Sequence, residues 1–311
     1  MKRIHLGKTD LEVPNIGLGC LRIVGLSPND AAAFVETAYA HGANFFDVAD
    51  SYHEGRSEEA LGQAIRTAKI DRLKLFLQTK CGIYQRSNGS IVRYDLSKKH
   101  IIECAEGSLR RLGVDYLDVL LLHRPDALME PEEVAEAFQL LSDQHKVRYF
   151  GVSNQNPAQM RLLKRYLTVP IIVNQLQLSV AHAGMIDLGM NVNMENAASA
   201  DHDGGVLDYC RLHDITIQPW SPFQYGFMEG VFIGDEKYAP LNRTLERIGE
   251  KYGVTNTAMA LAWLLRHPAK MQPIIGTMKR ERLIECLSAS EIQITREEWY
   301  EIYLSANRVI P

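Results

Sequence analysis

Short apolar runs alternate with amphipathic stretches along the whole sequence, and this alternation restricts the possible folds more than any other feature. Eight such runs occur, at residues 15–19, 44–48, 73–80, 117–123, 147–152, 171–175, 216–220 and 272–276. Strands that alternate with helices form parallel βαβ units, and the near-continuous apolar segments at 119–122 and 171–173 predict strands buried on both faces. Eight such units predict a (β/α)8 barrel.

Local signals mark where helices and flanking elements begin. Ser27 and Asn156 each precede a proline, the arrangement of an N-cap followed by proline at the first helical position. Thr295 and Glu298 have capping-box spacing, so we expect an added C-terminal helix. Residues 3–13 predict a hairpin with its turn at 7–10. The expected fold is therefore α/β: a (β/α)8 TIM barrel with an N-terminal β-hairpin and an added C-terminal helix.

A single domain spanning residues 1–311 is the expected organisation, because α/β barrels of this length are commonly one domain. Hydrophobic residues make up 46% of the chain, which argues against disorder. The formal charge is -4 with both signs interspersed, so we expect no nucleic-acid partner. The N-terminal residues predict no signal peptide and no run reaches membrane-spanning length, so we expect a cytoplasmic protein without membrane contact.

Two other kinds of site, a metal centre and a Rossmann nucleotide site, lack their sequence signatures. The five cysteines are scattered with no C-x-x-C pair, which favours reduced thiols. His182 and His202 lie in one loop, but no second pair stands at ligand spacing, so we expect no metal. Residues 17–19 begin a G-x-G-x-x-G fingerprint, but Arg22 replaces its third glycine.

Four polar residues lie where predicted strands lead into loops: Asp47, Tyr52, Lys80 and His123. Each alone has an ordinary structural explanation, but in a (β/α)8 barrel these ends share one face, so the side chains should converge. Carbonyl reduction needs an acid that protonates the developing alkoxide. We expect Lys80 to lower the pKa of Tyr52, Asp47 to keep Lys80 charged, and His123 to donate a hydrogen bond to the substrate oxygen.

These segments together resemble the aldo-keto reductase family, whose members carry an Asp, Tyr, Lys, His tetrad on a (β/α)8 barrel and bind NADP(H) without a Rossmann fold. The resemblance covers nearly the whole chain. The matching segments are residues 17–19, 46–52, 78–80 and 121–125. The resemblance implies reversible, NADPH-dependent reduction of an aldehyde or ketone to an alcohol, with Tyr52 as general acid assisted by Lys80, Asp47 and His123.

The resemblance also assigns residues to the nicotinamide half of the cofactor. Ser153, Asn154 and Gln175 match family residues that hold the carboxamide. The segment 220–222 is similar to an aromatic-Ser-Pro motif whose ring stacks on the nicotinamide, with Trp220 in place of the family's tyrosine. In the family the Ser-Pro pair runs by the pyrophosphate. The cofactor-binding residues expected in these parts of the chain are Gly19, Cys20, Asp47, Ser153, Asn154, Gln175, Trp220, Ser221 and Pro222.

The segment 274–282 resembles the family's site for the adenosine 2'-phosphate. Thr277 and Arg282 stand at matching positions, and Lys279 replaces the charge of a family lysine that is Gly276 here, so the resemblance favours NADPH over NADH. Glu285 matches an adenine contact, although an adjacent asparagine of the family is Cys286. A solvated helix start is the alternative explanation of the two cations.

The long loops at 177–205 and 221–240 are expected to be functional. The aromatic residues of the second loop either close over the cofactor or substrate or form a small separate core; these are Phe223, Tyr225, Phe227 and Phe232. The positions expected to line a substrate pocket are Ile23, Tyr84, Arg124, Trp220 and Phe223. The carbonyl substrate itself and the oligomeric state are left unspecified.

A second class of function stays open at this stage. The chain could be an NADPH-binding regulatory or sensor subunit that resembles the potassium-channel β subunits related to this family. An intact tetrad favours turnover, whereas a stably bound partner protein without NADPH oxidation would favour the sensor.

Overall fold

Eight parallel strands close into a barrel in the computed structural model of the chain, which describes residues 1–85, 90–227 and 229–311. Around the ring, β10 is followed by β11, β12, β3, β4, β5, β8 and β9, and β9 pairs with β10. The strands are β3 (Gly17–Gly19), β4 (Phe45–Asp47), β5 (Phe76–Cys81), β8 (Leu117–Leu122), β9 (Val147–Ser153), β10 (Ile171–Gln177), β11 (Thr216–Trp220) and β12 (Ile274–Ile275). The predicted (β/α)8 barrel is confirmed.

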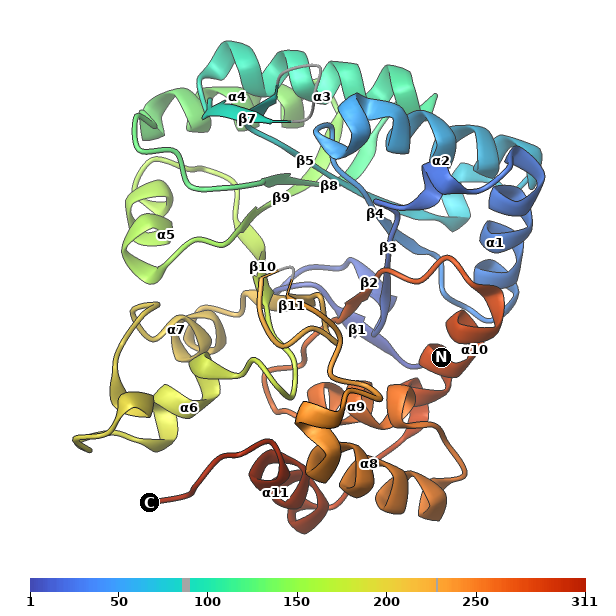
Figure 1. Cartoon of the computed structure of the whole chain (residues 1–311). Coiled ribbons are helices and arrows are strands. Elements are labelled where there is room, and N and C mark those ends of the chain that lie inside the picture. Colours follow the sequence, from blue (N-terminus) through green and yellow to red (C-terminus); the bar gives the residue numbers. More distant parts are fainter. Residues whose placement is uncertain (86–89, 228) are drawn as a thin grey trace.

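Helices surround the barrel (Figure 1). They are α1 (Pro28–Ala40), α2 (Arg56–Thr67), α3 (Lys98–Leu112), α4 (Pro131–Asp143), α5 (Pro157–Lys164), α6 (Gly184–Met190), α7 (Val206–Leu212), α8 (Ala239–Tyr252), α9 (Asn256–Leu265), α10 (Arg280–Ser288) and α11 (Arg296–Ser305). Their apolar faces pack on the outer faces of the strands in one continuous core. No described helix is long and apolar enough to cross a membrane.

The predicted helix caps are present. Ser27 Oγ accepts a hydrogen bond from the Asp30 amide at the start of α1, and Asn156 forms a capping box at the start of α5. Thr295 and Glu298 form the capping box of α11, the added C-terminal helix. Each cap satisfies amide groups that the first helical turn leaves without intrahelical partners.

The N-terminal hairpin of β1 (Arg3–His5) and β2 (Glu12–Pro14) closes the end of the barrel where the strands begin. Leu6, Leu11 and Val13 pack against inward-facing residues such as Phe45 and Val119 in a second apolar cluster. The Gly7 amide donates to Thr216 Oγ1, in the first residue of β11, at 2.8 Å. This apolar cluster fills the end of the barrel where the strands begin, so polar side chains can gather at the opposite end, where the strands finish.

Some predicted boundaries were wrong. The run at 73–80 becomes a strand only at Phe76, because Arg72–Lys74 form a short 3-10 helix capped by Asp71. The run at 272–276 contains a strand of only two residues. A hairpin of β6 (Ile83–Gln85) and β7 (Ile91–Tyr94) follows β5 and was not predicted. The predicted loop at 177–205 contains α6 and a 3-10 helix at Ala197–Ser199.

Candidate active site

An ion pair between Asp47 and Lys80 lies at the carboxyl end of the barrel. Asp47 ends β4 and Lys80 lies in the neighbouring strand β5, so the parallel pairing brings the two side chains together. Lys80 Nζ donates to Asp47 Oδ2 at 2.7 Å and to the Val48 carbonyl at 3.0 Å, and its side chain is fully buried. A buried ammonium needs such partners, because removing an unpaired charge from water is costly.

The hydroxyl of Tyr52 lies next to this pair. Lys80 Nζ is 3.4 Å from Tyr52 Oη and 5.0 Å from the centroid of its ring. After Tyr52 the backbone turns through left-handed conformations at His53, Glu54 and Gly55, with φ of 51°, 59° and 86°. A side chain at Gly55 would come within 2.6 Å of Arg111 Cδ, so this turn into α2 needs a glycine there.

Burial raises the pKa of Tyr52 above its ordinary value, and this effect outweighs the lowering by Lys80. The expectation that Lys80 brings the pKa of Tyr52 below its ordinary value is therefore wrong. The physical reason is that the neutral phenol is favoured in a buried site, while Asp47 offsets part of the field of Lys80. Tyr52 consequently carries its proton at neutral pH.

Lys80 stays charged in the same environment. Burial alone lowers its pKa, but the nearby Asp47 carboxylate and Tyr52 raise it more, so the pKa of Lys80 is higher than usual. The ammonium is therefore a permanent positive charge beside the tyrosine hydroxyl.

His123 lies on the other side of Tyr52. It follows the last residue of β8, and its ring meets the Tyr52 ring edge-on with centroids 5.6 Å apart. Burial, together with the charges of Lys80 and Arg124, holds the pKa of His123 well below its usual value, so the imidazole is neutral. Its Nδ1 lies 3.3 Å from Ser51 Oγ. When Ser51 donates to Nδ1, Nε2 carries the ring proton and can donate to a ligand.

A network of glutamines below Asp47 was missed by the sequence analysis. Gln78 Nε2 and Gln175 Nε2 donate to Asp47 Oδ1 at 2.6 and 3.0 Å, and both also donate to Gln218 Oε1. Gln218 donates in turn to Gln272 Oε1 at 2.8 Å, and Gln272 donates to the Pro14 carbonyl. All four amides are buried. The network satisfies the carboxylate oxygen that Lys80 does not contact.

The three residues expected at the nicotinamide carboxamide lie together. Ser153 Oγ donates to the Gln175 carbonyl at 2.9 Å, and Asn154 Nδ2 donates to Ser153 Oγ at 2.8 Å. Asn154 has a positive φ of 56°, a conformation that is often retained at functional sites. Within the described residues, no hydrogen bond reaches Gln175 Oε1, which leaves an acceptor for an amide such as a carboxamide.

Trp220 ends β11, and its side chain is held in place. Its Nε1 donates to Asn154 Oδ1 at 3.1 Å. Ser221 follows with a φ of 50°, and Pro222 is buried. The aromatic residues of the next loop divide into two sets: Phe232 is buried against Tyr238, whereas Phe227 is 64% exposed and lies edge-on to Trp220.

The segment expected at the 2'-phosphate surrounds the start of α10. Thr277 Oγ1 accepts from the Lys279 amide at 3.2 Å, and Lys279 is the N-cap residue of the helix. The side chains of Lys279 and Arg282 are exposed and form no ion pair in the described part of the chain. Arg22 joins them from the first loop and donates to the Gly276 carbonyl at 3.3 Å. Glu285 is half-buried one turn further along.

Other expected positions have structural explanations. A Cβ at Gly19 would lie 3.1 Å from Ile274 Cγ2, so the packing of β3 on β12 leaves little room for a side chain at this position. Cys20 is fully buried, and burial raises the pKa of its thiol. Ile23, expected to line a pocket, is fully buried in the core, so that expectation was wrong. Tyr84 lies on β6 beneath Arg93.

Asp50 lies between the barrel rim and α3. Its Oδ1 is buried with no hydrogen-bond partner in the described part of the chain. Burial, reinforced by the nearby Glu58, raises the pKa of Asp50 to about 7, although a contact with Cys104 opposes the change. Asp50 and Ser51 border a cavity of about 370 Å³ that reaches Tyr84 and His100.

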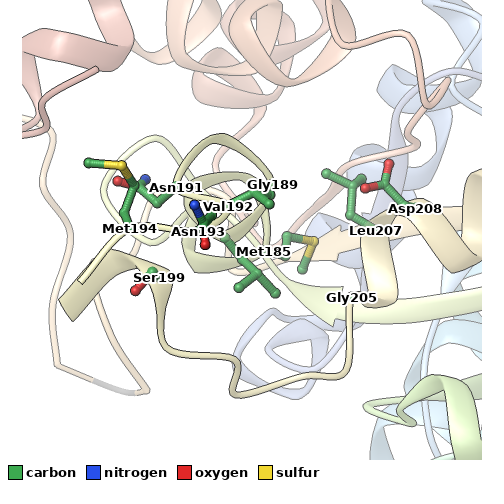
Figure 2. Close-up of a pocket in the computed structure, with 11 residues that line it drawn as sticks. Met185, Gly189, Asn191, Val192, Asn193, Met194, Ser199, Gly205, Leu207 and Asp208 are labelled. Atoms are coloured by element: carbon green, nitrogen blue, oxygen red, sulfur yellow. The ribbon is translucent and has the colours of Figure 1, made fainter. Parts of the chain in front are cut away.

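A second cavity has a volume of about 360 Å³. Figure 2 shows the residues that line it. It is formed by α6, the following loop and the start of α7, with Met185, Val192 and Leu207 in its lining. None of the expected site residues contributes to it. Within the described residues, no group of three or more His, Cys, Asp or Glu side chains is placed to hold a metal.

Comparisons with known proteins find the same fold and a matching family. The model of the aldo/keto reductase family matches residues 15–304. The chain is 34% identical over 313 residues to a 6-dehydroglucose reductase of Agrobacterium fabrum, covering 98% of each sequence. It is 35% identical over 312 residues to the uncharacterized oxidoreductase YcsN of Bacillus subtilis, covering 97% of each. A crystal structure of the thermostable aldo-keto reductase Tm1743 with the inhibitor epalrestat has a TM-score of 0.78 and 27% identity, covering 98% of this chain and 100% of that one.

The closed barrel and the relatives named as reductases define the class of protein as a (β/α)8-barrel oxidoreductase. The match extends from before the first barrel strand into α11. The chain belongs to the aldo/keto reductase family.

Proposed function

We propose that the chain reduces an aldehyde or ketone to an alcohol with NADPH, in a reversible hydride transfer for which Tyr52 is the general acid. One observation carries the proposal: a fully buried ammonium, Lys80 Nζ, lies 2.7 Å from Asp47 and 3.4 Å from Tyr52 Oη. A cation held beside a protonated phenol stabilises the phenolate that remains after proton transfer.

The roles of the residues follow from their contacts. NADPH, when bound, supplies the hydride. Tyr52 gives its proton to the carbonyl oxygen, and its raised pKa keeps it protonated until a substrate arrives. Lys80 stabilises the resulting phenolate, and Asp47 holds Lys80 in place. Neutral His123 donates a hydrogen bond to the carbonyl oxygen, which carries the developing negative charge.

The residues present fit the cofactor at both ends. The free acceptor on Gln175 and the remaining N–H of Asn154 complement a carboxamide, which has both donors and an acceptor. At the other end, Arg22, Lys279 and Arg282 surround the N-terminus of α10, where the helix dipole also favours an anion such as a 2'-phosphate. These cations favour NADPH over NADH.

A sugar-like aldehyde is one candidate substrate, because a relative that matches the chain over 98% of its length is named as a 6-dehydroglucose reductase. The test is oxidation of NADPH by the purified chain with a panel of aldehydes, with NADH in parallel and the alcohol product identified. Arg282→Ala should weaken NADPH binding by about tenfold to hundredfold and leave NADH binding little changed. NADPH binding without turnover of any carbonyl would refute the proposal and favour the sensor function.

A further inference from the structure

Arg124 crosses the mouth of the barrel. It follows His123 after β8, yet its guanidinium carbon lies 5.8 Å from the ring of Trp220 at the end of β11. In the ring of strands, β9 and β10 separate β8 from β11. The side chain therefore extends over the ends of two strands, above the space that the candidate active site surrounds.

The guanidinium of Arg124 has no hydrogen-bond acceptor or ion-pair partner among the residues that the structure describes. In the described parts of the chain, seven arginines lie against aromatic rings: Arg3, Arg72, Arg93, Arg124, Arg148, Arg161 and Arg308. The other six each form an ion pair or a hydrogen bond. Arg124 alone forms neither with any residue that the structure describes, although it is half-buried.

Aromatic side chains hold Arg124 in position. Its guanidinium carbon is 5.9 Å from the ring of Phe227 as well, and Phe227 meets Trp220 edge-on at 6.1 Å. Trp220 is fixed by its hydrogen bond to Asn154. Contacts with ring faces stabilise the cation without using its N–H groups, so its donors stay available for a ligand.

The positive charge of Arg124 also acts on the pKa values of Tyr52 and His123. Burial is the main cause of the altered pKa values of Tyr52 and His123, and Arg124 contributes to lowering both. Because the Lys80–Asp47 pair is neutral as a whole, Arg124 leaves a net positive charge beside the site.

We propose that Arg124 selects carbonyl substrates that carry a pair of oxygen acceptors, a carboxylate or two adjacent hydroxyls, close to the reacting carbonyl. This inference rests on the proposed reductase function and adds the substrate class. The planar guanidinium presents parallel N–H donors, which match two oxygens on neighbouring positions of a ligand. A plain alkyl aldehyde leaves these donors without partners.

The test compares three small aldehydes as NADPH-dependent substrates: succinic semialdehyde with a carboxylate, glyceraldehyde with a diol, and butanal with neither. For Arg124→Met, the ratio of kcat/KM for an oxygenated aldehyde to that for butanal should fall by about tenfold to hundredfold, mainly through KM. Arg124→Lys keeps the charge but lacks the parallel N–H donors of the guanidinium, so its kcat/KM ratio should lie between those of Arg124→Met and the wild type. The control is Arg161→Met on α5, another arginine on an aromatic ring, for which the ratio should not change.

The pattern of losses identifies the ligand group. A fall confined to succinic semialdehyde assigns a carboxylate, and a fall confined to glyceraldehyde assigns a diol; either result supports the inference. Equal losses with all three aldehydes, or no change in the ratio, overturn it while the reductase function stands. If the wild-type chain reduces no carbonyl at all, the reductase function fails, and the inference fails with it.

Discussion

Removing the buried ammonium by Lys80→Met should separate its contribution to stability from its contribution to chemistry. In the wild type, Lys80 Nζ neutralises the Asp47 carboxylate at 2.7 Å, and both side chains are buried. The substitution leaves that carboxylate with only the amides of Gln78 and Gln175 as donors. Breaking a buried pair on one side costs about 3–5 kcal/mol, so the free energy of unfolding at neutral pH should fall by about that amount.

The double variant Asp47→Asn/Lys80→Met is the matched control. The amide oxygen of the new asparagine still accepts from both glutamines, and no buried charge is left unpaired. Stability should therefore return to within about 1–2 kcal/mol of the wild type. Turnover should not return, because Tyr52 still lacks its cation; both variants should lose about 100-fold to 10,000-fold in kcat.

The assays are urea unfolding followed by tryptophan fluorescence and steady-state oxidation of NADPH. Unchanged stability of Lys80→Met would show that the carboxylate does not depend on the ammonium. A double variant that regains activity would refute the role of Lys80 beside Tyr52.

Two further predictions concern groups next to this pair. Gln78→Leu removes hydrogen-bond donors from Asp47 and Gln218 and should lower the free energy of unfolding, measured in urea, by about 1–3 kcal/mol. Gln177→Leu is the control and should have little effect, because Gln177 Nε2 has no partner in the described part of the chain. Equal losses in the two variants would contradict the network. Folding raises the pKa of Asp50 from 3.8 to about 7, so the native state loses stability as pH rises between these values, while the unfolded chain ionises first. Asp50→Asn should therefore gain stability relative to the wild type across that range and keep the gain above pH 7; a pH-independent difference would rule this out.

The barrel itself could be predicted, because its signal is local. Near-continuous apolar runs and N-cap residues such as Ser27 and Asn156 depend on each strand or helix separately, and the structure retains them. The hairpin of β6 and β7 has no such signal. All residues of β7 are exposed, and the strand exists only because it pairs with β6.

The candidate tetrad could be predicted because each member lies at or just beyond a strand end. The glutamine network could not, since a glutamine that faces the barrel interior looks the same in a sequence as one that faces water. One signal was available: Gln78 lies two residues before Lys80, so in a strand both face the same side. The direction of the pKa shift of Tyr52 was wrongly predicted, because that direction depends on how deeply the side chain is buried, and the strand pattern does not show this.

The most direct test of the central claim is a single turnover of Tyr52→Phe. The substitution removes only the hydroxyl that lies 3.4 Å from Lys80 Nζ. NADPH affinity, measured by fluorescence titration, should stay within about threefold of the wild type, since the ring remains. Oxidation of bound NADPH by a reducible aldehyde, followed by stopped flow, should slow by at least about 100-fold. An unchanged rate of NADPH oxidation would contradict the assignment of Tyr52 as the proton donor.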